Sequence, residues 1–373
     1  MSRLPRALHP GAWWLWALGL AAAASRTTNP LLLALIVAVA GMVVASRRGD
    51  APWAFAFRYY LWAGLFVVVS RVAFRVLFGA GDTGHVLLDL PEVPLPGPAS
   101  GIHLLGPVSV EHLLGGLYDG MRLAAMLICL GAANALADPK RMLKAVPGAL
   151  YEVGTAVVVA LSVAPQLVES LLRVRRARRL RGGRQSGLRA LRGIAMPVLV
   201  DALDRSLALA AAMDSRGYGR GGGAPRGVRL VTGTLLVAGL LGTCVGVYGL
   251  LDGTTPGYLG LPMLLAGLLL AGGGLPLAGR RVRRSVYRPD PWALPETLVA
   301  ASGLTAAAVL VLTSRVDPGN LYPALDPLSW PGLPLAGTLG VLVALLPAWL
   351  APPPVPVVAA PQAAGTGATR VPA

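Results

Sequence analysis

Two short segments of the sequence share one pattern of residue types. Residues 177–182 read Ala-Arg-Arg-Leu-Arg-Gly and residues 212–217 read Ala-Met-Asp-Ser-Arg-Gly, so each has Ala, three residues, Arg and then Gly. An ordinary helix C-terminus explains a single copy, because Arg complements the negative end of the helix dipole and Gly takes the left-handed cap. Two copies 35 residues apart, each after a proline, are harder to explain in that way. The candidate functional residues are therefore Ala177, Arg181, Gly182, Ala212, Arg216 and Gly217.

A second candidate group lies within an apolar stretch. Asp119 and Arg122 are three residues apart, on one face of a predicted membrane helix. An ionisable group at the bilayer centre costs roughly 2.5–3.5 kcal/mol and usually pairs or faces protein. The spacing favours a structural intramembrane ion pair over a substrate site. Arg71 and Arg75, in the preceding apolar stretch, are expected to extend to the outer interface, with contact to a partner subunit as the alternative.

The sequence lacks the residue spacing that catalysis, nucleotide binding or metal binding would require. The only lysines are Lys140 and Lys144, and neither follows the Gly-rich turn that a phosphate-binding P-loop requires. The four histidines lack zinc-type spacing, and Cys129 and Cys244 lie in apolar stretches, where a thiol usually behaves as a small hydrophobe. We expect no enzyme activity, no cofactor and no metal site.

The composition indicates a chain that has lipid as a solvent. Of its 373 residues, 55% are hydrophobic and 13% are charged, whereas soluble domains average about 25% charged residues. The net charge of +16 is concentrated between residues 140 and 229, which hold 17 Lys and Arg against five Asp and Glu. Residues 76–121 contain no Lys or Arg. This distribution is typical of membrane topology and does not indicate nucleic-acid binding.

The uncharged runs predict about eight transmembrane helices in an all-α polytopic protein. A span needs about 20 apolar residues. With the N-terminus inside, the basic clusters fall on the cytoplasmic side and the acidic loop 79–112 falls outside, as the positive-inside rule requires. The first apolar run could pass for a signal peptide, but its removal would invert this arrangement, so we expect it to remain as a helix. The predicted spans are 11–25, 29–46, 55–78, 113–137, 228–251, 255–277, 293–313 and 332–350.

The segment from Tyr151 to Leu172 is expected not to cross the membrane. Its uncharged core is short and contains Pro165, and a crossing would place a basic cluster outside. We expect a helix at the cytoplasmic interface instead, in contact with membrane lipids. After Gly187 a second amphipathic helix is predicted, with Leu199, Leu203, Leu207 and Ala210 on its apolar face and Asp201, Asp204 and Arg205 on its polar face.

These patterns predict four regions. Transmembrane helices 1–4 occupy residues 1–137, and a cytoplasmic helical segment occupies residues 138–227, between the fourth and fifth spans. Transmembrane helices 5–8 occupy residues 228–350. The proline-rich tail, residues 351–373, is expected to be disordered. Both termini are expected in the cytoplasm of a bacterial cell, with the chain in the plasma membrane.

The ordered set of motifs resembles the transmembrane T component of energy-coupling factor (ECF) transporters, the EcfT/CbiQ family. In that family two cytoplasmic coupling helices each end in Ala-Arg-Gly. Here Pro165 to Gly182 and Pro197 to Gly219 are similar to those helices, with Leu180 and Ser215 in place of the family's Ala. Leu8-His9-Pro10, Asn29-Pro30 and the run from Leu105-Gly106-Pro107 to Asp138-Pro139 add to a resemblance that covers roughly residues 8–250.

The resemblance implies a scaffold for an ABC-type importer. Two cytoplasmic ATPase subunits and a small substrate-binding membrane protein, the S component, would be its partners. Arg181 and Arg216 would each enter a groove on one ATPase, and Gly182 and Gly217 would let the backbones come close. The transported substrate, a vitamin or a transition-metal ion such as cobalt, would be selected by the S component.

Three other functions stay open from the residues alone. A conventional or solitary permease would keep the ATPase contacts and carry its own substrate path. A membrane-embedded transferase or protease would need paired acids or an activated nucleophile at membrane depth. An RNA-binding or lipid-binding protein could use the arginines, but it would not need two matched helix ends.

Overall fold

The computed structural model describes residues 6–49, 55–78, 85–89, 91, 93–94, 103–145, 150–182, 188–218, 226–251, 256–279 and 290–353. The chain divides into two compact units. Unit 1 consists of residues 1–142 and 290–373, and unit 2 consists of the intervening residues 143–289.

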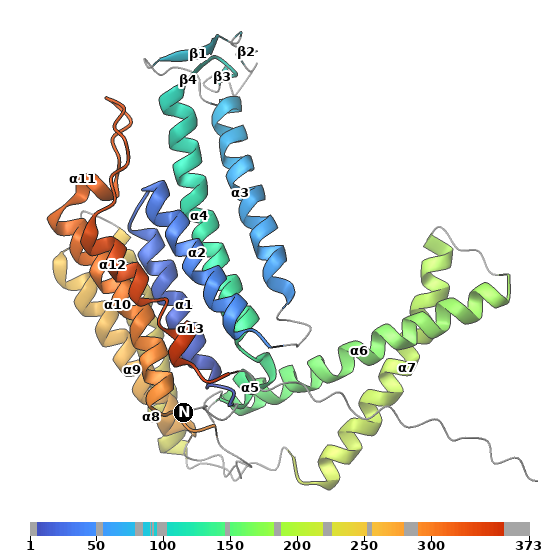
Figure 1. Ribbon diagram of the computed structural model, residues 1–373. Helices are drawn as coiled ribbons and strands as arrows, with labels where there is room; N and C mark the ends of the chain where they lie inside the picture. The colour runs from blue at the N-terminus through green and yellow to red at the C-terminus, as the bar shows by residue number, and fades with distance from the viewer. Residues whose placement is uncertain are drawn as a thin grey trace, which may run out of the picture. The chain divides into compact units, whose positions relative to one another are not determined.

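The described part of unit 1 is a helical bundle with two small antiparallel sheets (Figure 1). β1 pairs with β4, with Val86 opposite Ser109, and β2 pairs with β3. Its elements in chain order are α1 (Pro10–Ser25), α2 (Pro30–Arg47), α3 (Phe57–Phe78), β1 (Val86–Asp89), β2 (Val93–Pro94), β3 (His103–Leu104), β4 (Pro107–Ser109), α4 (Val110–Leu136), α5 (Pro139–Lys144, which runs across the unit boundary), α10 (Leu294–Val316), α11 (Pro318–Leu321), α12 (Leu335–Val343) and α13 (Pro347–Leu350).

The core of unit 1 is centred on α1, which contacts α2, α4 and α10. Trp16 and Leu20 are fully buried there, and the indole Nε1 of Trp16 donates to the carbonyl of Ala344, 2.9 Å away. Gly19 of α1 and Gly303 of α10 face each other so closely that a Cβ on either would overlap the backbone of the other helix. Small residues allow this close approach between helices.

A His-Pro pair begins α1, and an Asn-Pro pair begins α2. The side chain of His9 accepts a hydrogen bond from the amide of Gly11, and Asn29 accepts one from the amide of Leu31. In each case the following proline occupies the first helical turn, where its missing N–H costs nothing. Asn29 also donates to the carbonyls of Asn320 and Gly332, so its cap ties α2 to the C-terminal part of unit 1.

Glycines on α4 also bring α3 and α4 together. A Cβ on Gly120 would lie 3.0 Å from the Cα of Val68, and one on Gly131 would overlap the ring of Tyr60. Within α3 only Phe57 and Gly64 are buried. The other residues of this apolar helix are half-buried or exposed, as lipid contact on one side would require.

The described part of unit 2 contains four long helices and one turn of 3-10 helix at Gly257–Leu259. Glycines form the contact between α8 and α9: Gly239 lies against Ala271, and Gly246 lies against Leu264. α6 and α7 cross each other (Figure 1). The four helices are α6 (Tyr151–Leu180), α7 (Leu188–Ser215), α8 (Arg226–Leu251) and α9 (Leu261–Gly279).

The described residues contain seven helices long and apolar enough to cross a membrane. The chain is an all-α polytopic membrane protein apart from its two small sheets. Six of the seven helices coincide with predicted spans. The seven are α2, α3, α4, residues 153–180 of α6, residues 230–251 of α8, residues 257–277 around α9, and α10.

The structure differs from the predicted spans at three places. The first predicted span forms α1, which has 16 residues and is therefore about 24 Å long, shorter than the roughly 30 Å hydrocarbon core. The last predicted span is divided between α12 and α13. α6 has the length and composition of a span, although the sequence predicts that it stays at the interface. The count of eight and the course of α6 stay predictions.

The predicted regions and the observed units group the chain by different criteria. The regions follow the expected side of the membrane, whereas the units follow contacts between residues. Contacts do not report on which side of a membrane a segment lies, so the four regions stay predictions. The Gly-rich segment 219–223, the basic cluster 280–284 and most of the tail, residues 354–373, lie outside the described residues.

Candidate functional site

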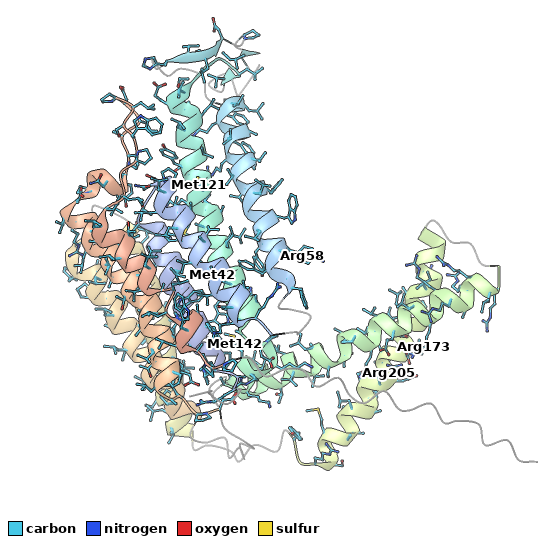
Figure 2. All side chains as sticks on the ribbon, in the orientation of Figure 1. Met42, Arg58, Met121, Met142, Arg173 and Arg205 are labelled. Atoms are coloured by element: carbon cyan, nitrogen blue, oxygen red, sulfur yellow. The ribbon has the colours of Figure 1, made fainter. Side chains whose placement is uncertain are left out.

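The contact between α6 and α7 is organised around one carboxylate, that of Asp201. Ser170 of α6 is buried, and its Oγ donates to Asp201 Oδ2 at 2.5 Å. Arg205, one helical turn along α7, lies 3.0 Å from Asp201 Oδ2, and Arg173 of α6 lies 3.5 Å from it. Figure 2 shows Arg173 and Arg205 close to where the two helices cross. These contacts fix the crossing point of α6 and α7.

The ionisation of Asp201 is tuned by the same contacts. The hydrogen bond from Ser170 lowers the pKa of Asp201 below its ordinary value of 3.8, and the charges of Arg205 and Arg173 act in the same direction against partial desolvation. The carboxylate is therefore charged at neutral pH. An ionised acceptor makes a stronger hydrogen bond to the Ser170 hydroxyl than a neutral one would.

α6 and α7 end in the same backbone conformation. α6 ends at Leu180 and α7 at Ser215, and two residues later Gly182 and Gly217 have φ of +68° and +77°. The amide of Gly217 donates to the carbonyl of Asp214, and that of Tyr218 donates to Met213, which is a complete Schellman cap. The amide of Gly182 donates to Arg179 in the equivalent position.

Arg181 and Arg216 consequently occupy the same position, one residue before the left-handed glycine. Both side chains are exposed, and among the described residues neither guanidinium has a hydrogen-bond or ion-pair partner. A Cβ on either glycine would meet nothing within 4 Å, so the glycines are required by their φ values and not by crowding. Ala177 and Ala212 are exposed one turn before these arginines.

α7 contacts its neighbouring helix through its polar face, whereas a helix that packs on an apolar core usually does so through its apolar face. Its polar residues Asp201 and Arg205 face α6, while Leu199, Leu203 and Leu207 are each about 60% exposed. The sequence predicts these two faces, but not that the polar face would make the contact with α6. An exposed row of leucines on a helix indicates a surface that another protein or lipid covers.

The sequence spacing suggests that Asp119 pairs with Arg122, but in the structure Asp119 pairs with a different arginine. Its Oδ2 lies 3.3 Å from Arg75 Nη2, on the neighbouring helix α3. Arg75 Nη1 also lies 3.3 Å from His112 Nε2, and Gly116 leaves room for it, since a Cβ there would approach the Arg75 side chain to 2.8 Å. Arg75 therefore makes contacts within unit 1 and does not simply extend to the interface.

No group of three or more His, Cys, Asp or Glu side chains that could hold a metal ion occurs in the described part of the chain. His85 Nδ1 contacts Glu111 Oε1 at 2.8 Å, and the pair joins the residue before β1 to the first turn of α4. Cys129 is buried and Cys244 is exposed, each as a free thiol.

A charged cluster near the N-terminus was not anticipated from the sequence. Glu296, in the first turn of α10, is fully buried and accepts a hydrogen bond from Arg6 Nη2 at 2.7 Å. It also accepts from the amides of His9 and Ala293. The only sequence signal was a lone acid in the first turn of an apolar helix, which has many local explanations. The partner 290 residues away could not be inferred from it.

Comparison with known proteins bears on the N-terminal 60% of the chain. Residues 1–225 match the protein family described as CbiQ, cobalt transport protein. Among curated proteins, none matches the chain. The matched segment contains the crossed helices α6 and α7 with both matched ends, and it stops one residue before α8 begins at Arg226.

Proposed function

Since the chain belongs to the CbiQ family of cobalt transport proteins, we propose that it is the transmembrane T component of an ECF-type ABC importer. The family match supports a membrane component of cobalt transport and favours a transporter over an enzyme. In the proposed complex, two cytoplasmic ATPases dock on α6 and α7, and a separate S component delivers the substrate. The complex takes up cobalt(II) through the plasma membrane, and both termini of this chain lie in the cytoplasm.

The observation that carries the proposal is the equivalence of Arg181 and Arg216. Each is the exposed C-cap residue of one helix, and each is followed by a glycine with positive φ. An ATPase pair offers two copies of one surface, so it requires two copies of one docking element. Two helix ends with the same backbone conformation meet that requirement, whereas a diffuse basic patch would not need it.

The guanidinium group suits such a docking role. It stays charged at any physiological pH, and its planar fork binds carboxylates or backbone carbonyls through two hydrogen bonds. Because neither Arg181 nor Arg216 is engaged by another described residue, each is available to a partner. The Asp201 contacts hold the two helices against each other, so that both arginines are carried by one pair of packed helices.

The exposed leucines of α7 supply the apolar part of the same surface. Leu199, Leu203 and Leu207 would be covered by an ATPase or by the S component. A charged anchor beside an apolar surface is the usual composition of a protein interface. The ATP chemistry itself would come from the partners, because neither lysine of this chain lies in a P-loop.

Co-purification tests the proposal. The tagged full-length chain, extracted from its native membranes, should carry two ATPase subunits and a small hydrophobic protein. Arg181→Ala and Arg216→Ala should leave membrane insertion near normal, because an exposed arginine contributes less than about 1 kcal/mol to folding. Each should sharply reduce the retained ATPase, because loss of one partner of a desolvated charged contact costs about 2–5 kcal/mol.

Arg175→Ala is the matched control. Arg175 is an exposed arginine of the same helix, six residues before Arg181, and it is not at the helix end. It should retain the ATPase nearly as the wild type does. If ATPase retention fell only with the number of arginines removed, wherever they lay, the basic segment would be a general electrostatic patch and the docking proposal would fail.

A further inference from the structure

In the sequence, unit 2 is inserted into unit 1, and an ion pair joins two residues of unit 1 at the two ends of the insertion. The chain leaves unit 1 after Met142 and returns to it at Asp290. Arg141 and Asp290 form a two-pronged ion pair, with Nε 3.0 Å from Oδ2 and Nη2 2.9 Å from Oδ1. Both side chains are half-buried. We call this pair the clasp.

The clasp is part of a larger set of contacts within unit 1. Arg141 also donates from Nη1 to the carbonyl of Leu8, 3.0 Å away. The residue after Asp290, Pro291, accepts a hydrogen bond from Arg6, and the ring of Trp292 lies 5.3 Å from that of His9. The returning chain is thus held against both Arg141 and the N-terminal segment just before it enters α10.

On the other side, the backbone at Arg141 is held to the segment that follows α4. Asp138, which follows α4, accepts hydrogen bonds from the backbone amides of Lys140 and Arg141 at the start of α5. The clasp therefore joins the connection that leads to α4 with the connection that leads to α10. α4 and α10 both pack on α1, the central helix of unit 1.

We propose that Arg141 and Asp290 are positioning residues that join the two chain connections of unit 2, so that a movement of α6 and α7 reaches α4 and α10 together. Without the clasp, Arg141 and Asp290 could move independently, so that a movement could reach α4 without reaching α10. A planar guanidinium gripping a carboxylate at two points resists rotation as well as separation, which a single hydrogen bond does not. This inference rests on the proposed function, in which ATPases move α6 and α7.

The test uses the complete complex of full-length chain, ATPases and S component, reconstituted in liposomes. Asp290→Asn keeps the size of the side chain and removes its charge. We expect ATPase retention and ATP hydrolysis to stay close to the wild type. Cobalt(II) taken up per ATP hydrolysed should fall about tenfold, the change that about 1.4 kcal/mol makes in an equilibrium constant. The exchanged pair Arg141→Asp with Asp290→Arg should recover most of the lost uptake per ATP.

A purely structural clasp would behave differently. It would lower the yield of folded complex and leave the uptake per ATP of the surviving complex unchanged, which would overturn the proposal. Glu111→Gln, which removes a charge from the His85 contact elsewhere in unit 1, is the control and should not change the ratio. An equal loss in that control would also overturn it. If Asp290→Asn does not accumulate, Arg141→Lys, which keeps the charge and loses the fork, is measured in the same way.

The two proposals fail separately. A wild-type chain that retains no ATPase would refute the proposed function and the clasp mechanism with it. Normal ATPase retention, with an Asp290→Asn complex that transports as many ions per ATP as the wild type, would refute the clasp mechanism alone.

Discussion

Ser170 Oγ donates a 2.5 Å hydrogen bond to Asp201 Oδ2 and so joins α6 to α7 through a buried hydroxyl and a charged carboxylate. The two helices carry Arg181 and Arg216 at their ends. Their crossing point therefore determines how far apart, and in what orientation, the two arginines are presented. A change at Asp201 should therefore alter the relative position of the two helix ends, although neither arginine contacts Asp201.

Asp201→Asn should loosen the crossing. The neutral amide accepts a weaker hydrogen bond from Ser170 and loses its ion pairs with Arg205 and Arg173. We expect faster amide hydrogen exchange in α6 and α7, with no change in α1 or α10, and lower ATPase retention. Asp204→Asn is the matched control, because Asp204 is an exposed acid of the same helix. Equal exchange in the two variants would contradict the role of Asp201.

The same contact should depend on pH in one direction only. A carboxylate whose pKa is lowered in the folded state stabilises that state fully above its ordinary value, here 3.8, and loses the effect as pH falls through the lowered pKa. Exchange protection in α7, corrected for intrinsic rates, should be flat from about pH 8 to 5 and decline below about pH 4. Asp201→Asn should remove this decline. A decline that persists unchanged in the variant would assign it to another group.

The amphipathic pattern of α7 predicts a helix and its two faces correctly, but not which face contacts α6. Such a pattern is usually interpreted by placing apolar residues inside. In α7 the leucines are exposed and Asp201 faces α6, because Ser170, Arg173 and Arg205 satisfy the carboxylate. A sequence does not show whether an apolar face is to be covered by its own chain or by another molecule.

Replacement of the helix-end glycines should show whether they are needed for their positive φ or because a partner leaves no room for a side chain. At φ of +77°, Gly217→Ala should cost about 1–2 kcal/mol at the α7 cap. Gly217→Asn should cost less, because Asn tolerates the left-handed region. In titrations with purified ATPase, the affinity should be highest for Gly, lower for Asn and lowest for Ala, because the backbone conformation that presents Arg216 becomes less stable in that order. An equal loss for Asn and Ala would indicate that the partner approaches too closely for any side chain.

The long spans of the bundle could be predicted from apolar length alone, whereas the packing within it could not. α2, α3, α4 and α10 coincide with predicted spans because each has a long apolar stretch with few charged residues. The pairing of Asp119 with Arg75 depends on how α3 lies against Gly116, which spacing within α4 does not reveal. The short α1 is enclosed by helices that come from both ends of the chain.

Gly303→Ala should destabilise unit 1 although alanine favours helices. A Cβ at Gly303 would overlap the Trp16 backbone, so the variant should lose about 1–3 kcal/mol through displacement of α10 from α1. Thermal unfolding in detergent, followed by tryptophan fluorescence, would measure the loss. Gly41→Ala is the control: Gly41 of α2 has nothing within 4 Å of an added Cβ, so alanine there should be neutral or stabilise by about 0.5–1 kcal/mol. Equal effects at the two positions would contradict the close contact of α1 and α10.

The course of α6 can be decided by cysteine labelling in a chain whose own Cys129 and Cys244 have been replaced by alanine. Leu150 and Leu180 lie at the two ends of α6, both exposed. Because the arginines from Arg173 onward favour the cytoplasmic side, and because an interfacial helix keeps both ends on one side, Leu150→Cys and Leu180→Cys should both resist a membrane-impermeant maleimide applied to intact cells.

Leu87→Cys, on β1, should be labelled under the same conditions, which confirms that the reagent reaches the outer surface. Labelling of Leu150→Cys together with protection of Leu180→Cys would make α6 a true span, as its length and composition permit. Labelling of Leu180→Cys would instead remove the cytoplasmic location on which the docking of ATPases at Arg181 and Arg216 relies. The three cysteines together therefore test both the topology and the proposed function.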